Sequence, residues 1–142
     1  MGNTKSIGVA YSDQDISGAD TLSAVDIYAT DEIGYAADAQ GTVTQLTDKS
    51  TGVTLNKSAG QITMNNAALA ATTNVSFTLT NSMISAKDVI VVNVAGGVAS
   101  NETYNCWVSG HSAGSCTFVL RNISGGSLSE AVVLNFAVIH CT

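Results

Sequence analysis

The sequence predicts an all-β protein, an antiparallel β-sandwich of jelly-roll or immunoglobulin-like kind with an extended N-terminal arm. About eight short stretches of strand-like composition recur at spacings of about 8 to 15 residues, as in sandwiches and small barrels. Clusters of Gly, Asn, Ser and Thr separate these stretches, and a hydrophobic fraction of 45% can supply a sizeable core. The 142 residues hold one sandwich of about 100 residues together with an appended segment.

Charge divides the chain into an acidic arm, residues 1–40, and a β domain, residues 41–142. Residues 1–48 contain eight Asp and Glu against one Lys, whereas residues 49–142 contain four Lys and Arg against three Asp and Glu. The arm is rich in Ser, Ala, Gly and Asp, so we expect it to become ordered only against a partner. A disordered leader is the alternative.

The first four strands are expected at residues 42–46, 53–55, 61–64 and 75–80. The last of these, VSFTLT, alternates apolar and polar side chains most cleanly, as does a strand with one buried face. The polar segments TDKSTG and NKSAG separate the earlier strands as turns. Residues 65–71, NNAALAA, are expected to form a helical turn or a loop.

The second four strands are expected at residues 88–94, 104–109, 115–121 and 131–141. The first and last of these are apolar on both faces, which is typical of a central strand or of one that faces another subunit. The chain has no Pro, so edge strands must be protected by Gly, Asn, short length or subunit contacts. Only 11% of residues are charged, against about 25% in a typical domain, which indicates that partners cover part of the surface.

A hairpin is expected around the segment GHSAG, with His111 at its midpoint. In that register Cys106 faces Cys116 on one face, while Trp107 lies on the other. A cross-strand disulfide between Cys106 and Cys116 is then geometrically possible. Two reduced, buried thiols are the alternative, and the default for a chain with no recognisable export signal.

The residue pattern excludes several kinds of chemistry. The only histidines, His111 and His140, occupy a loop tip and the end of the chain, and neither belongs to a zinc-binding pattern. Cys116 and His111 are five residues apart across a turn, so a nucleophile–base pair is conceivable, but a turn His beside a core Cys is the favoured interpretation. No phosphate-binding glycine motif occurs, no paired carboxylates are evident in the β domain, and no basic cluster suits nucleic acid. No apolar run is long enough to span a membrane. We therefore expect no enzyme activity, cofactor or metal.

Three segments carry a family resemblance: residues 43–69 (VTQLTDKSTGVTLNKSAGQITMNNAAL), 75–94 (VSFTLTNSMISAKDVIVVNV) and 113–139 (AGSCTFVLRNISGGSLSEAVVLNFAVI). They resemble a module of tailed-phage virion proteins, which occur as capsid decoration, head-fibre or tail-fibre-associated proteins. The resemblance implies a virion structural component with a β-sandwich domain and a trimeric assembly. It covers most of residues 41–142 and does not extend to the arm.

The resemblance and the charge-poor composition together predict a capsid decoration or cement protein on the phage head. Its expected partners are the major capsid protein or another virion protein, and further copies of the chain. The expected contact residues are Tyr28, Ile33 and Tyr35 of the arm, with Val91 and Ile139 on exposed strand faces.

A head- or tail-fibre component, or a receptor-binding adhesin, is the alternative function. In that case Trp107 and His111 are the residues expected to contact glycans on a host surface. The short chain argues against it, because a fibre usually needs a long stalk or a repeat and the sequence has neither.

Overall fold

The computed structural model of the chain describes residues 26, 29 and 32–141. Contacts between residues separate Met1–Ile33 from Gly34–Thr142, and the fold reported below is that of the second segment. Tyr28, one of the expected contact residues, lies outside the described residues.

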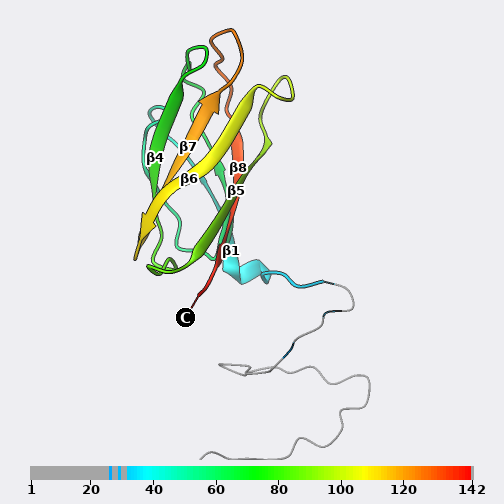
Figure 1. Cartoon of the computed structure of the whole chain (residues 1–142), viewed down its shortest axis with the longest axis vertical. Coiled ribbons are helices and arrows are strands. Elements are labelled where there is room, and N and C mark those ends of the chain that lie inside the picture. The colour runs from blue at the N-terminus through cyan, green and yellow to red at the C-terminus, as the bar shows by residue number, and fades with distance from the viewer. Residues whose placement is uncertain (1–25, 27–28, 30–31, 142) are drawn as a thin grey trace, which may run out of the picture. The chain divides into compact units, whose positions relative to one another are not determined.

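One short 3-10 helix and eight strands form this segment (Figure 1). In chain order they are η1 (Ala37–Ala39), β1 (Gln40–Thr44), β2 (Val53–Thr54), β3 (Ala59–Thr63), β4 (Asn74–Thr80), β5 (Val89–Gly96), β6 (Tyr104–Ser112), β7 (Ser115–Asn122) and β8 (Val133–Ile139). Each of the eight strands overlaps one of the eight stretches predicted from the sequence. Residues 65–71 form a loop. Within it, Leu69 pairs with Leu128 in an isolated antiparallel bridge.

The strands form two four-stranded sheets, which confirms the predicted β-sandwich. Sheet 1 has the order β1-β3-β8-β5 and sheet 2 the order β2-β4-β7-β6. Four of the six strand pairs are antiparallel, whereas β1 with β3 and β2 with β4 run parallel. The parallel pairs arise because the first four strands alternate between the two sheets. The chain therefore places β3 beside β1 and β4 beside β2, each pair running in the same direction.

The core lies between the two sheets, and Phe118 is at its centre. The Phe118 ring is fully buried and meets the Phe77 ring edge-on, with a centroid distance of 5.7 Å. It also meets Phe136 of sheet 1 at 6.1 Å. Alternation supplies the remaining core side chains, as in β4, where Phe77 and Leu79 are buried and their Ser and Thr neighbours are exposed.

The β6–β7 hairpin differs from the predicted one in its register. Its strands reach Ser112 and Ser115, so the turn consists of Ala113 and Gly114 only, and Gly114 supplies the positive φ of 83° that such a short turn requires. An irregularity between Val108 and Gly110 then shifts the pairing by one residue. A β-bulge of this kind cannot be read from the alternation of side chains.

The shifted register corrects the proposed cysteine pairing. Cys106 lies opposite Leu120, and Cys116 lies opposite His111. The two cysteines are therefore about four residues apart along the ladder, or about 13 Å, whereas a disulfide needs Cα atoms within about 7 Å. Both thiols are free in the structure, in agreement with the alternative of reduced cysteines.

Candidate functional site

The outer face of sheet 1 carries no ionisable side chain. Register places its outward side chains in rows that cross the sheet: Val89 and Ile139; Gln40, Ala59, Ala137 and Val91; Thr42, Gln61, Asn135 and Asn93; Thr44, Thr63 and Val133. The eight strands of the described chain contain one charged residue, Arg121, and no Asp, Glu or Lys. Apart from Asp38 in η1, the other charged residues that the structure describes lie outside the strands and the helix. The broad surfaces of the sandwich therefore lack the charges that normally keep edge strands apart.

An apolar patch occupies one end of this face, and we define it by Val89, Val91, Ala137 and Ile139. Val89 pairs with Ile139, and Val91 pairs with Ala137. The side chains of Val89, Val91 and Ile139 remain 51%, 49% and 52% exposed. The structure thus brings the predicted contact residues Val91 and Ile139 together as diagonal neighbours on adjacent strands, and adds Val89.

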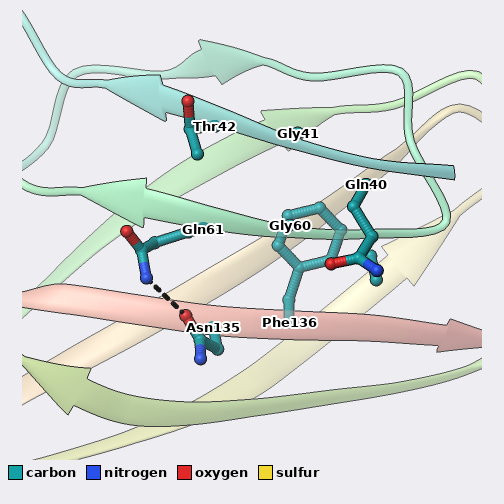
Figure 2. Close-up of a pocket in the computed structure, with 8 residues that line it drawn as sticks. Gln40, Gly41, Thr42, Gly60, Gln61, Asn135 and Phe136 are labelled. Carbon is teal, nitrogen blue, oxygen red and sulfur yellow. Dashed lines mark hydrogen bonds between the residues drawn. The ribbon is translucent and has the colours of Figure 1, made fainter. Parts of the chain in front are cut away.

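A shallow hollow occupies the other half of the face. It has a volume of about 480 Å³. Its lining consists of Gln40, Gly41, Thr42, Ala59, Gly60, Gln61, Asn135 and Phe136. Figure 2 shows the Gln61 amide reaching across from β3 to Asn135 of β8, where Nε2 donates to Oδ1 at 3.1 Å.

The rim of the hollow is held in place by hydrogen bonds. Gln40 Nε2 donates to the Tyr35 carbonyl at 2.7 Å, which orients the Gln40 side chain at the edge strand. Sequence reasoning missed Gln40, Gln61 and Asn135 as a group. Alternation within 59–63 and 133–139 places Gln61 and Asn135 outward, but only the parallel pairing of β1 with β3 brings Gln40 beside them.

The other predicted contact residues are placed differently. Ile33 is 79% exposed. Tyr35 is also exposed, and its hydroxyl donates a hydrogen bond to the Val138 carbonyl. This bond fastens the segment that precedes η1 to the end of sheet 1, so the Tyr35 hydroxyl is already engaged within the domain.

The residues expected to contact a glycan, Trp107 and His111, do not line the hollow on sheet 1. Trp107 is half-buried on β6 and lies opposite Val119 of β7. The Val119 side chain is buried although it is on the outer face of sheet 2. His111 is exposed at the hairpin end, four residues further along β6 and beyond the bulge. The structure does not bring the two side chains into one site.

A buried polar cluster lies under the loops at the other end of the sandwich. Lys49 is buried, and its Nζ donates to the carbonyls of Asn65 and Glu130. Burial lowers the pKa of Lys49, and the Glu130 carboxylate partly opposes that shift. Burial and the same carboxylate raise the pKa of Tyr104 to about 12. Tyr104 Oη and Glu130 Oε2 are both buried, and neither makes a hydrogen bond of good geometry. The negative charge of Glu130 nevertheless disfavours ionisation of the Tyr104 hydroxyl. These groups join loops, and nothing in their arrangement pairs a nucleophile with a base.

The comparisons with known proteins found no match among family models, curated proteins or solved structures. Within the described residues, no helix is both long and apolar enough to cross a membrane. The same residues contain no group of three or more His, Cys, Asp or Glu side chains placed to hold a metal ion.

Proposed function

We propose that this chain is a structural protein of a tailed-phage virion that decorates the assembled head through the apolar patch at one end of the outer face of sheet 1. The observation that carries the proposal is the apolar patch, in which Val89, Val91 and Ile139 are each about half exposed on a face without charge. Clustered apolar side chains of this kind mark protein contact sites on soluble domains.

The low charge of the strands supports a permanent partner. A surface in a solvated monomer usually carries both signs of charge, which keep it soluble and deter edge pairing. Here the strands of both sheets hold one charged residue, and both edges of sheet 1, β1 and β5, have none. The proposed partners are the major capsid protein and further copies of this chain, with a trimer as the proposed assembly.

The stabilising mechanism is preferential binding. A protein that binds the assembled shell and not its separated subunits stabilises the shell by RT ln(1 + [L]/Kd), or about 2.7 kcal/mol at a hundredfold excess over Kd. This mechanism needs no catalytic group, only a complementary face of sufficient area.

Cosedimentation with purified heads that lack the protein tests the proposal. A charge placed in the patch, by Val91→Glu or Ile139→Glu, should abolish binding because it would be buried without a partner. The matched control is Thr78→Glu, which adds the same charge to an exposed strand residue on the outer face of sheet 2. Circular dichroism checks that all three variants fold. Unchanged binding of both patch variants would refute the proposed contact face.

A further inference from the structure

The hollow on sheet 1 combines several hydrogen-bonding side chains with a small apolar floor. Gln40 and Thr42 stand on β1, Gln61 on β3 and Asn135 on β8, and all four side chains are exposed. Ala59 lies between them, in the row that Gln40 begins. Its methyl group is shorter than the amide side chains of Gln40 in the same row and of Gln61 further along β3, which explains why the surface is hollowed at this point.

The rim offers both donors and acceptors. Because Gln61 Nε2 donates to Asn135 Oδ1, the Asn135 Nδ2 group and the Gln61 Oε1 atom remain available to a ligand. Gln40 likewise keeps its Oε1 acceptor while its Nε2 donates to Tyr35. The Thr42 hydroxyl can donate or accept.

No charged side chain lines the hollow. The nearby cation, Lys57, packs its stem against Gly41, and its Nζ donates to the Asp38 carbonyl at 2.7 Å. A phosphate or carboxylate ligand would need a cation or converging backbone N–H groups. A metal ion or an organic cation would need carboxylates. The lining therefore selects a ligand that is neutral and that both donates and accepts hydrogen bonds.

We propose that this hollow binds a neutral saccharide. The vicinal hydroxyl groups of a sugar both donate and accept, which matches the amide and hydroxyl rim, and its C–H face can lie on the Ala59 methyl. The volume of about 480 Å³ lies within the range of about 300 to 1,000 Å³ typical of small-molecule sites. This site is separate from the apolar patch and does not depend on the proposed role on the phage head.

Titration of the isotope-labelled full chain by NMR tests the site. The probes are neutral oligosaccharides of hexose, N-acetylhexosamine and deoxyhexose, each at about 10 mM, which saturates a site of millimolar Kd. We expect at least one to cause saturable shifts in the side-chain amide signals of Gln40, Gln61 and Asn135. Free N-acetylneuraminic acid and a heparin oligosaccharide are the anionic probes and should not shift these signals.

Two substitutions separate the hollow from the rest of the face. Asn135→Asp removes the free donor and should weaken saccharide binding about tenfold. Its matched control is Asn93→Asp, which places the same charge one strand away in the same row, outside the lining, and should change the affinity less than about twofold. Thr42→Val, nearly equal in shape, is the second hollow variant if Asn135→Asp disturbs the backbone spectrum.

Three results would overturn the inference. The first is the absence of shifts with every neutral probe. The second is equal binding of the anionic probes. The third is that an extended peptide changes the chemical shifts of the β1 backbone amides whereas no saccharide does. That result would identify β1 as a strand edge that binds peptide.

Discussion

His140 Nδ1 lies 2.9 Å from Asp88 Oδ2, a contact that joins the end of β8 to the start of β5. The same carboxylate accepts hydrogen bonds from the backbone N–H groups of Ser85 at 2.7 Å and Cys141 at 3.2 Å. Asp88 is buried, although His140 is nearly half exposed. The carboxylate thus closes the turn before β5 and holds the residues after β8 beside the apolar patch.

The protein should lose stability in acid partly through Asp88. The hydrogen bond from Ser85 is the main cause that lowers the pKa of Asp88 below its ordinary value of 3.8, and the contacts with Cys141 and His140 add to it, although burial opposes the shift. A lowered folded-state pKa gives stability that is present above the unfolded pKa and is lost as pH falls through the folded one. Melting temperatures measured from about pH 6 to about pH 2 should therefore fall less steeply for Asp88→Asn than for the parent chain.

The control for that experiment is Asp38→Asn, which changes an exposed carboxylate in η1. It should keep the acid dependence of the parent, including the part due to Asp48, whose pKa is lowered mainly by hydrogen bonds from Ser50. If Asp88→Asn and Asp38→Asn follow the same curve, the Asp88 carboxylate does not provide the acid-sensitive stability.

The three cysteines should react with alkylating reagents at very different rates. Burial raises the pKa of Cys116 to about 12 and also raises that of Cys106, whereas Cys141 is exposed. Because the thiolate is the nucleophile, Cys116 should react more than about 100-fold more slowly than Cys141 at pH 8. Mass spectrometry of iodoacetamide-treated protein measures the order of labelling.

After mild oxidation, non-reducing peptide mapping should show no Cys106–Cys116 disulfide, and finding one would contradict the observed register.

The sequence predicted which residues form strands but not how the strands pair. Alternation identified β4 and the two-faced character of β5 and β8, because each is a local property of consecutive side chains. The turn of the β6–β7 hairpin lies at Ala113 and Gly114 rather than at His111, and this displacement places Cys106 opposite Leu120 instead of Cys116. The bulge after Val108 changes that register by only one residue, and side-chain alternation does not reveal it. The parallel pairing of β1 with β3 depends on the path of the chain between the sheets. For that reason the outward positions of Val91 and Ile139 could be expected, whereas the hollow bounded by Gln40, Gln61 and Asn135 could not.

Gly97 should tolerate no side chain, although its neighbour Gly96 should. Gly97 has a φ of 70°, and a Cβ atom placed there would lie 2.0 Å from the Ala131 carbonyl oxygen. Gly97→Ala should lower the free energy of unfolding by about 2 to 4 kcal/mol, because the backbone must move or adopt a strained conformation. A Cβ at Gly96 meets no atom within 4 Å, so Gly96→Ala should change stability by less than about 1 kcal/mol. Urea denaturation measures both values, and equal effects would refute the proposed clash.

Among the polar side chains of the 122–128 loop, Asn122 should contribute most to the free energy of unfolding. It is fully buried, and its Nδ2 donates to the carbonyls of Leu69 at 2.9 Å and Gly126 at 2.8 Å. Its Oδ1 accepts from the backbone N–H of Ser124 at 2.9 Å. Asn122→Ala removes these hydrogen bonds and leaves a cavity at a fully buried position, although the Leu69 carbonyl keeps its bond from the Leu128 N–H. We therefore expect a loss of about 2 to 4 kcal/mol in the free energy of unfolding.

The matched control for Asn122 is Asn105, an exposed residue on the adjacent strand β6. Asn105→Ala should change the unfolding free energy by no more than about 0.5 kcal/mol, as is usual for surface positions. Hydrogen exchange supplies a second readout, because Asn122 joins two loops that are far apart in sequence. The Leu69 and Leu128 amides, which bond to each other's carbonyls at 2.8 Å and 3.0 Å, should lose protection in Asn122→Ala and keep it in Asn105→Ala. Retained protection at both amides in Asn122→Ala would show that the Leu69–Leu128 bridge holds the loops together without the Asn122 side chain.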